Sequence, residues 1–77
     1  MKEKILRQIR ALDTEIADHQ KRLDAAVAEF KEAASKYDAY DIVTFIPGKI
    51  RDIEYERSKI AALNEQRRML VWMCKEE

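Results

Sequence analysis

One mostly apolar position recurs through residues 5–40 with an unbroken alternation of four-residue and three-residue steps. Side chains at this spacing lie on one face of a helix, as in the contact strip of a coiled coil. No glycine or proline interrupts residues 2–46. The pattern therefore predicts one long helix over about residues 2–40 that packs against another helix. The members of this row, the first seam, are Ile5, Ile9, Leu12, Ile16, His19, Leu23, Ala26, Phe30, Ala33, Tyr37 and Tyr40.

The end of this helix has two interpretations. Residues 35–38, Ser-Lys-Tyr-Asp, resemble a capping box and so favour a break near Ser35. The seam spacing nevertheless passes through Ser35 without a skip, which favours an unbroken helix to Tyr40. We adopt the unbroken helix as the prediction.

Residues 41–47 are predicted to form an apolar turn. The β-branched run at residues 42–44 is a poor helix former, and Ile46 precedes a proline and so favours extended backbone. Pro47 suits the first turn of a second helix, where its missing N–H is not needed. The second helix is predicted over about residues 48–75, which makes the chain an all-α, antiparallel helical hairpin in a single domain, residues 1–77.

The predicted second helix is apolar on two sides. At 100° per residue, one broad face carries a row of apolar side chains, and a second row falls nearly opposite. Arg57, Asn64 and Arg67 lie on or beside the first face. A helix of this kind needs two neighbours, the first helix and a second copy of the chain. The first row is Ile53, Ile60, Leu63, Leu70, Val71 and Cys74, and the second is Tyr55, Ala62, Met69 and Met73.

Size and length point to self-association. A chain of 77 residues is near the limit for a stable single core. One cysteine excludes an internal disulfide, and one cysteine with one histidine argues against a metal cluster. The predicted first helix is also about a dozen residues longer than the second, which leaves Ile5, Leu6, Ile9 and Leu12 partly uncovered. These points predict a homodimeric, coiled-coil-like four-helix bundle.

Charge and targeting signals restrict the cellular compartment and the partners that we expect. Fifteen basic and fifteen acidic residues cancel, so the chain has no bulk attraction to nucleic acid or to an anionic membrane. No apolar run approaches the length of a transmembrane helix, and the N-terminus lacks the apolar segment of a signal peptide. A lone thiol fits a reducing compartment. We therefore expect a cytoplasmic protein with no membrane partner.

The expected function is non-enzymatic. The chain has no nucleophile elbow, phosphate-binding glycine loop or zinc-binding spacing, and no cofactor is implied. Surplus apolar helix faces predict a small adaptor, regulator or inhibitor that binds another protein or itself. The candidate interface residues are Ile5, Ile9, Leu12, His19, Tyr55, Met69, Trp72 and Met73.

Polar side chains near the seam have two interpretations each. His19 is either a pH-sensitive interface residue or a polar seam residue that sets the register. Arg57, Asn64 and Arg67 either pair with carboxylates or line a pocket for an anionic small molecule. Cys74 is expected to be an inert buried thiol. The candidate carboxylate partners are Asp13, Glu15, Asp24 and Glu29.

The sequence also contains two further candidate surfaces, one apolar and one basic. Phe45 and Ile46 in the predicted turn either dock into a partner or plug the open end of the bundle. The basic residues near the chain ends either belong to solvated helix faces, which is the interpretation we prefer, or form a patch for the alternative function. That function is a dimeric helical-hairpin regulator that binds nucleic acid through its basic N-terminal end. This patch consists of Lys4, Arg7, Arg10, Arg67 and Arg68.

Overall fold

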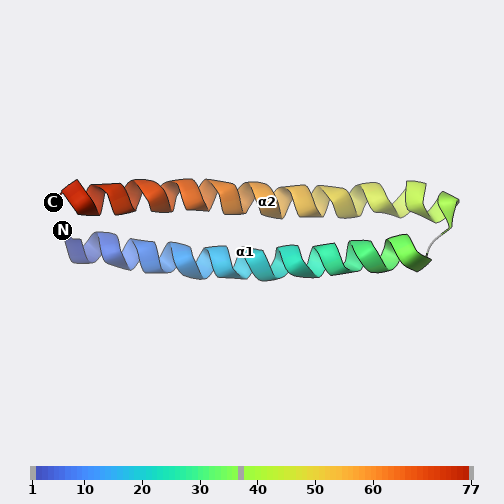
Figure 1. The fold of residues 1–77 in the computed structure, drawn as a ribbon, viewed down its shortest axis with the longest axis horizontal. Coiled ribbons are helices and arrows are strands. Elements are labelled where there is room, and N and C mark those ends of the chain that lie inside the picture. The colour runs from blue at the N-terminus through green and yellow to red at the C-terminus, as the bar shows by residue number, and fades with distance from the viewer. Residues whose placement is uncertain (1, 37, 77) are drawn as a thin grey trace.

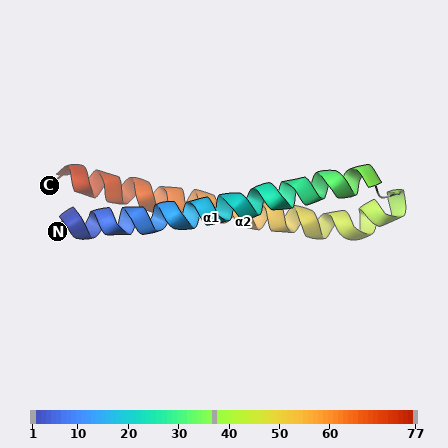
Figure 2. The same cartoon turned by 90° about the horizontal axis from the view of Figure 1, so that it is seen from below.

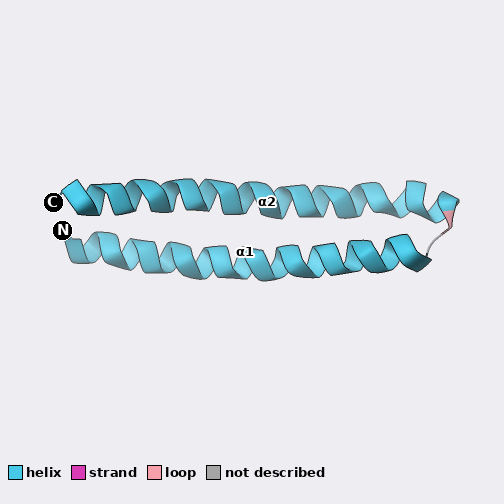
Figure 3. Cartoon of the chain, in the orientation of Figure 1, coloured by secondary structure: helices cyan, strands magenta, loops and turns pink. Residues whose placement is uncertain are grey.

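Two long helices make up the protein. The computed structural model describes residues 2–36 and 38–76, apart from the side chain of residue 42. Helix α1 spans Lys2–Lys36 and helix α2 spans Ala39–Glu76 (Figure 3). The described part of the chain holds no strand. The predicted all-helical class is confirmed.

The two helices lie side by side along their whole length. They run in opposite directions, so that the N and C ends of the chain meet at one end of the molecule (Figure 1). The Cα positions extend over 57 × 14 × 12 Å. The protein is therefore a thin rod only two helices wide, and each helix keeps a large part of its circumference in solvent.

The chain reverses earlier than the seam spacing predicts. Helix α1 ends at Lys36 rather than near Tyr40, and the predicted turn at residues 41–47 is helical. The carboxylate of Asp38 accepts a hydrogen bond of 2.9 Å from the backbone N–H of Asp41, which caps the N-terminus of α2. Such a cap contributes about 1 kcal/mol. The alternative of a break near Ser35 is closer to the structure.

The last two residues of the predicted first seam follow Lys36, the last residue of α1. Tyr40 belongs to α2 and is 77% exposed, so it does not continue the first seam. Residue 37 lies outside the described part of the chain. The spacing of four and three residues is a property of a continuous helix, and it loses its meaning where the helix ends.

Pro47 lies inside α2 rather than at its start. A proline in a helix interior removes one hydrogen bond and crowds the carbonyl four residues earlier, which bends the helix. The first turns of α2, ahead of Pro47, deviate from the axis of the rest of the helix (Figure 2). Ile46 in this segment is buried, at 8% exposure. Packing against α1 thus stabilises helical turns that local propensity disfavours.

Gly48 offers a direct test of the helical conformation next to Pro47. It is helical, its φ is not positive, and a Cβ added to it meets no atom within 4 Å. Because alanine loses less backbone entropy than glycine in a helix, Gly48→Ala should raise the free energy of unfolding by about 0.5–1 kcal/mol. Urea unfolding followed by circular dichroism measures the change. A loss of stability would contradict the helical assignment at Gly48.

The core is the strip where two seams meet. The first seam is confirmed from Ile5 to Ala33, since each of its residues in that range is buried or half-buried. Helix α2 carries a matching seam with the same alternation of steps, and all its members are also buried or half-buried. We call it the second seam: Ile46, Lys49, Ile53, Glu56, Ile60, Leu63, Arg67, Leu70 and Cys74.

The two helices are nearly equal in length, at 35 and 38 residues. The predicted mismatch of about a dozen residues is therefore wrong. Because α1 ends at Lys36 and α2 begins at Ala39, α2 is long enough to reach the N-terminal turns of α1. Ile5, Ile9 and Leu12 are accordingly only 8–9% exposed.

Candidate interaction surface

Polar residues of the second seam form ion pairs with α1. The Nε of Arg67 donates to Oδ1 of Asp13 at 2.6 Å, and the Nζ of Lys49 lies 3.6 Å from Oε2 of Glu29. Each pair joins residues far apart in the sequence, so a shift of one helix along the other would separate them. These contacts therefore specify the register of the two helices. Asp13 was among the predicted partners of Arg67, whereas Glu29 pairs with a lysine instead.

His19 forms the third such contact. Its Nδ1 lies 2.5 Å from Oε2 of Glu56, and the two side chains are only 16% and 12% exposed. The imidazole is thus engaged within its own chain at a seam position. This contact supports the interpretation of His19 as a register-setting residue, and the pH-sensitive interface stays a prediction. Sequence reasoning missed Glu56 and Lys49 because both are charged, although the seam spacing runs through them.

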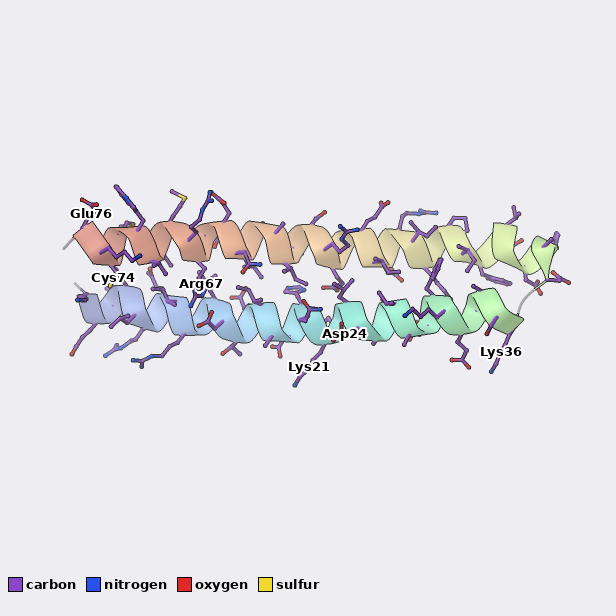
Figure 4. The ribbon with its side chains drawn as sticks, in the orientation of Figure 1. Lys21, Asp24, Lys36, Arg67, Cys74 and Glu76 are labelled. Atoms are coloured by element: carbon purple, nitrogen blue, oxygen red, sulfur yellow. The ribbon has the colours of Figure 1, made fainter. Side chains whose placement is uncertain are left out.

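Of the remaining candidates near the seam, two are exposed and two face the other helix. Arg57 and Asn64 are exposed. Arg57 borders a shallow depression together with the carboxylate-bearing Glu54, which is an unfavourable setting for an anionic ligand. Arg67 and Cys74 lie on the side of α2 that faces α1 (Figure 4), and Cys74 is half-buried.

Several large apolar side chains of α2 are exposed to solvent. Tyr55, Met69, Trp72 and Met73 are between 46% and 63% exposed. The ammonium of Lys59 lies 5.7 Å from the ring centroid of Tyr55. Met69, Trp72 and Met73 fall within two turns of one helix, so they form one continuous apolar surface near the chain ends.

This surface borders an open groove between the two helices, which we call the terminal groove. Its volume is about 490 Å³. None of its lining residues is charged, and most are apolar. They are Gln8, Ala11, Leu12, Gln66, Met69, Leu70 and Met73.

The opposite end of the rod is charged. Lys36 donates a hydrogen bond of 2.7 Å to Glu32, and this bond with the lysine charge holds the pKa of the Glu32 carboxyl below its ordinary value. The depression at this end is lined by Glu29, Glu32, Ala33, Lys36 and Lys49. This depression is therefore mostly charged, in contrast to the terminal groove, although Tyr40, Val43 and Phe45 near the same end are also exposed.

The two candidate tip residues differ in their exposure. Phe45 is 52% exposed, whereas Ile46 is buried and belongs to the second seam. The turn that was expected to present both side chains together is helical. Successive residues on a helix point about 100° apart, so one faces α1 while the other faces outward. Whether Phe45 contacts a partner stays a prediction.

The candidate basic patch is interspersed with acidic residues, and Arg7 and Arg10 border one depression together with Glu3. Arg67, a residue of the second seam, is paired with Asp13, and Arg68 donates a hydrogen bond of 2.7 Å to Glu65. Lys4, Arg7 and Arg10 are exposed on α1. The acidic partners reduce the local positive potential. Nucleic-acid binding stays a prediction.

Comparisons with known proteins leave the family of this chain open. No family model matches it, and neither a curated protein nor a solved structure does so. Within residues 2–36 and 38–76, no helix is long and apolar enough to cross a membrane. The same residues contain no group of three or more His, Cys, Asp or Glu side chains placed to hold a metal ion.

Proposed function

We propose that this chain is a small, non-enzymatic protein–protein interaction module, built as an antiparallel helical hairpin. It acts as an adaptor, regulator or inhibitor by presenting an apolar helix surface to another polypeptide. The lone thiol, Cys74, fits a reducing compartment such as the cytoplasm.

One observation carries this proposal. Met69, Trp72 and Met73 are exposed beside the uncharged terminal groove, in a chain in which 39% of the residues are charged. Methionine and tryptophan are enriched where proteins bind one another, because methionine adapts its shape and tryptophan contributes a large contact area. A contiguous apolar patch of this kind marks an interaction site in a soluble chain.

The experiment compares which other proteins are retained by three immobilised forms of this chain, the baits. The wild type and Ile50→Glu should retain the same bound proteins, and Met69→Glu/Met73→Glu should lose them. Ile50 is the matched control, because it is also a partly exposed apolar residue of α2 but does not line the terminal groove. Circular dichroism checks that all three baits stay helical. Equal capture by all three baits would contradict the proposal.

A further inference from the structure

We propose that the occupant of the terminal groove is the same groove of a second copy of this chain. Two copies pack with their terminal ends overlapping and their connecting ends pointing in opposite directions. A two-fold axis passes near Met69, which lies in the middle of the α2 residues that line the groove. This inference rests on the proposed function, because it names the first partner of the same surface.

The surface area of the single chain supports a second copy. Folded monomers follow a scaling law by which a 9.1 kDa protein exposes about 4,900 Å². This chain exposes 6109 Å². The surplus of about 1,200 Å² exceeds the roughly 800 Å² that each partner buries in a standard stable interface. The rod as a whole therefore exposes more surface than a folded monomer of its mass, as expected of one half of a dimer.

The incomplete burial of the core in the single chain also supports a second copy. The most buried side chains among the described residues retain 5–9% exposure, and none falls below 2%. Two helices meet only along one strip, so each seam residue is covered from one side. Pairing two such rods places a second layer over Leu12 and Leu70, which line the terminal groove from the seams. A four-helix arrangement encloses a core that two helices leave open.

The absence of charge in the groove favours a copy over a different protein. In a two-fold interface the residues nearest the axis face their own counterparts, so a charge there would meet a like charge. All seven residues that line the groove are uncharged, and Gln8 and Gln66 are able to donate and accept hydrogen bonds across the axis. The charged end of the rod, with Glu32 and Lys36, lies away from the contact.

Sedimentation and light scattering of the purified chain test the inference. The wild type and Ile50→Glu should have twice the 9.1 kDa mass of one chain at about 100 µM, and Met69→Glu should remain a monomer. The emission of Trp72, the single tryptophan, should change with dilution in the first two proteins only. A monomeric wild type would overturn the inference. So would a dimer disrupted by Ile50→Glu but not by Met69→Glu.

A cross-linking experiment tests the position of the axis. In a Cys74→Ser background, Met69→Cys brings two thiols close together across the axis, and a mild added oxidant should join them as an intermolecular disulfide. Tyr55→Cys in the same background is the control, because position 55 lies four helical turns further from the chain ends. Efficient cross-linking at position 55 and none at position 69 would overturn the proposed geometry.

The failure of this inference is distinguishable from failure of the proposed function. If the purified chain is monomeric but the capture of another protein depends on Met69 and Met73, the second copy is wrong and the interaction surface stands. If the chain dimerises through Met69 but captures no other protein through this surface, the inference stands and the adaptor, regulator or inhibitor role is wrong.

Discussion

Replacing Leu63 with alanine is expected to lower the free energy of unfolding by about 2–5 kcal/mol. Leu63 lies in the second seam and is only 9% exposed. Truncation removes buried apolar surface and leaves a cavity between the two helices. Because a small domain has only a few kcal/mol of stability in total, this change should unfold a large fraction of the chain.

Urea unfolding followed by circular dichroism at one fixed protein concentration measures this loss. Val43→Ala is the matched control, because Val43 is on the same helix and is 75% exposed. Its stability should change by no more than about 0.5 kcal/mol. Similar losses in the two variants would contradict the assignment of Leu63 to the core.

Replacing His19 with leucine is expected to lower the free energy of unfolding by about 1–3 kcal/mol, although leucine suits a seam better than histidine. The reason is the partner of His19 on the other helix, Glu56. Without the imidazole, the carboxylate of Glu56 stays 12% exposed and loses the hydrogen-bond partner that the structure gives it. A buried carboxylate without a partner pays its desolvation cost in full.

A double-mutant cycle separates this contact from general packing. His19→Leu/Glu56→Leu should recover the stability lost in His19→Leu, because two apolar side chains then meet at the seam. His19→Leu with wild-type stability would contradict the importance of the contact. The same variant tests the pH-sensitive interface, since an oligomeric state with unchanged pH dependence would exclude that role for His19.

Much of the fold was predictable because it depends on local periodicity. The alternation of steps from Ile5 to Ala33 requires a helix with one apolar face, and every residue of that row is buried or half-buried. The exposed surface at Met69 and Met73 was also predictable, because both lie off the main apolar face of their helix. Periodicity of this kind needs no knowledge of the partner helix.

The place where the chain reverses was not predictable in this way. Two local signals competed, a resemblance to a capping box at residues 35–38 and a proline at position 47, and sequence spacing favoured the second. The structure breaks near the first signal, but Asp38 rather than Ser35 caps the new helix, and Pro47 lies within α2. The position of the reversal depends on how much of α2 packs on α1. An earlier reversal lets the helices pack over a longer strip, which buries Ile46, Ile9 and their neighbours.

The sequence by itself determined that the chain is helical and that one face of its first helix must be covered. Tertiary structure decided what covers that face. Lys49, Glu56 and Arg67 became seam residues because partners on α1 compensate the cost of placing charge between helices. The terminal groove likewise exists only where side chains of both helices meet, so no pattern along one helix contains it.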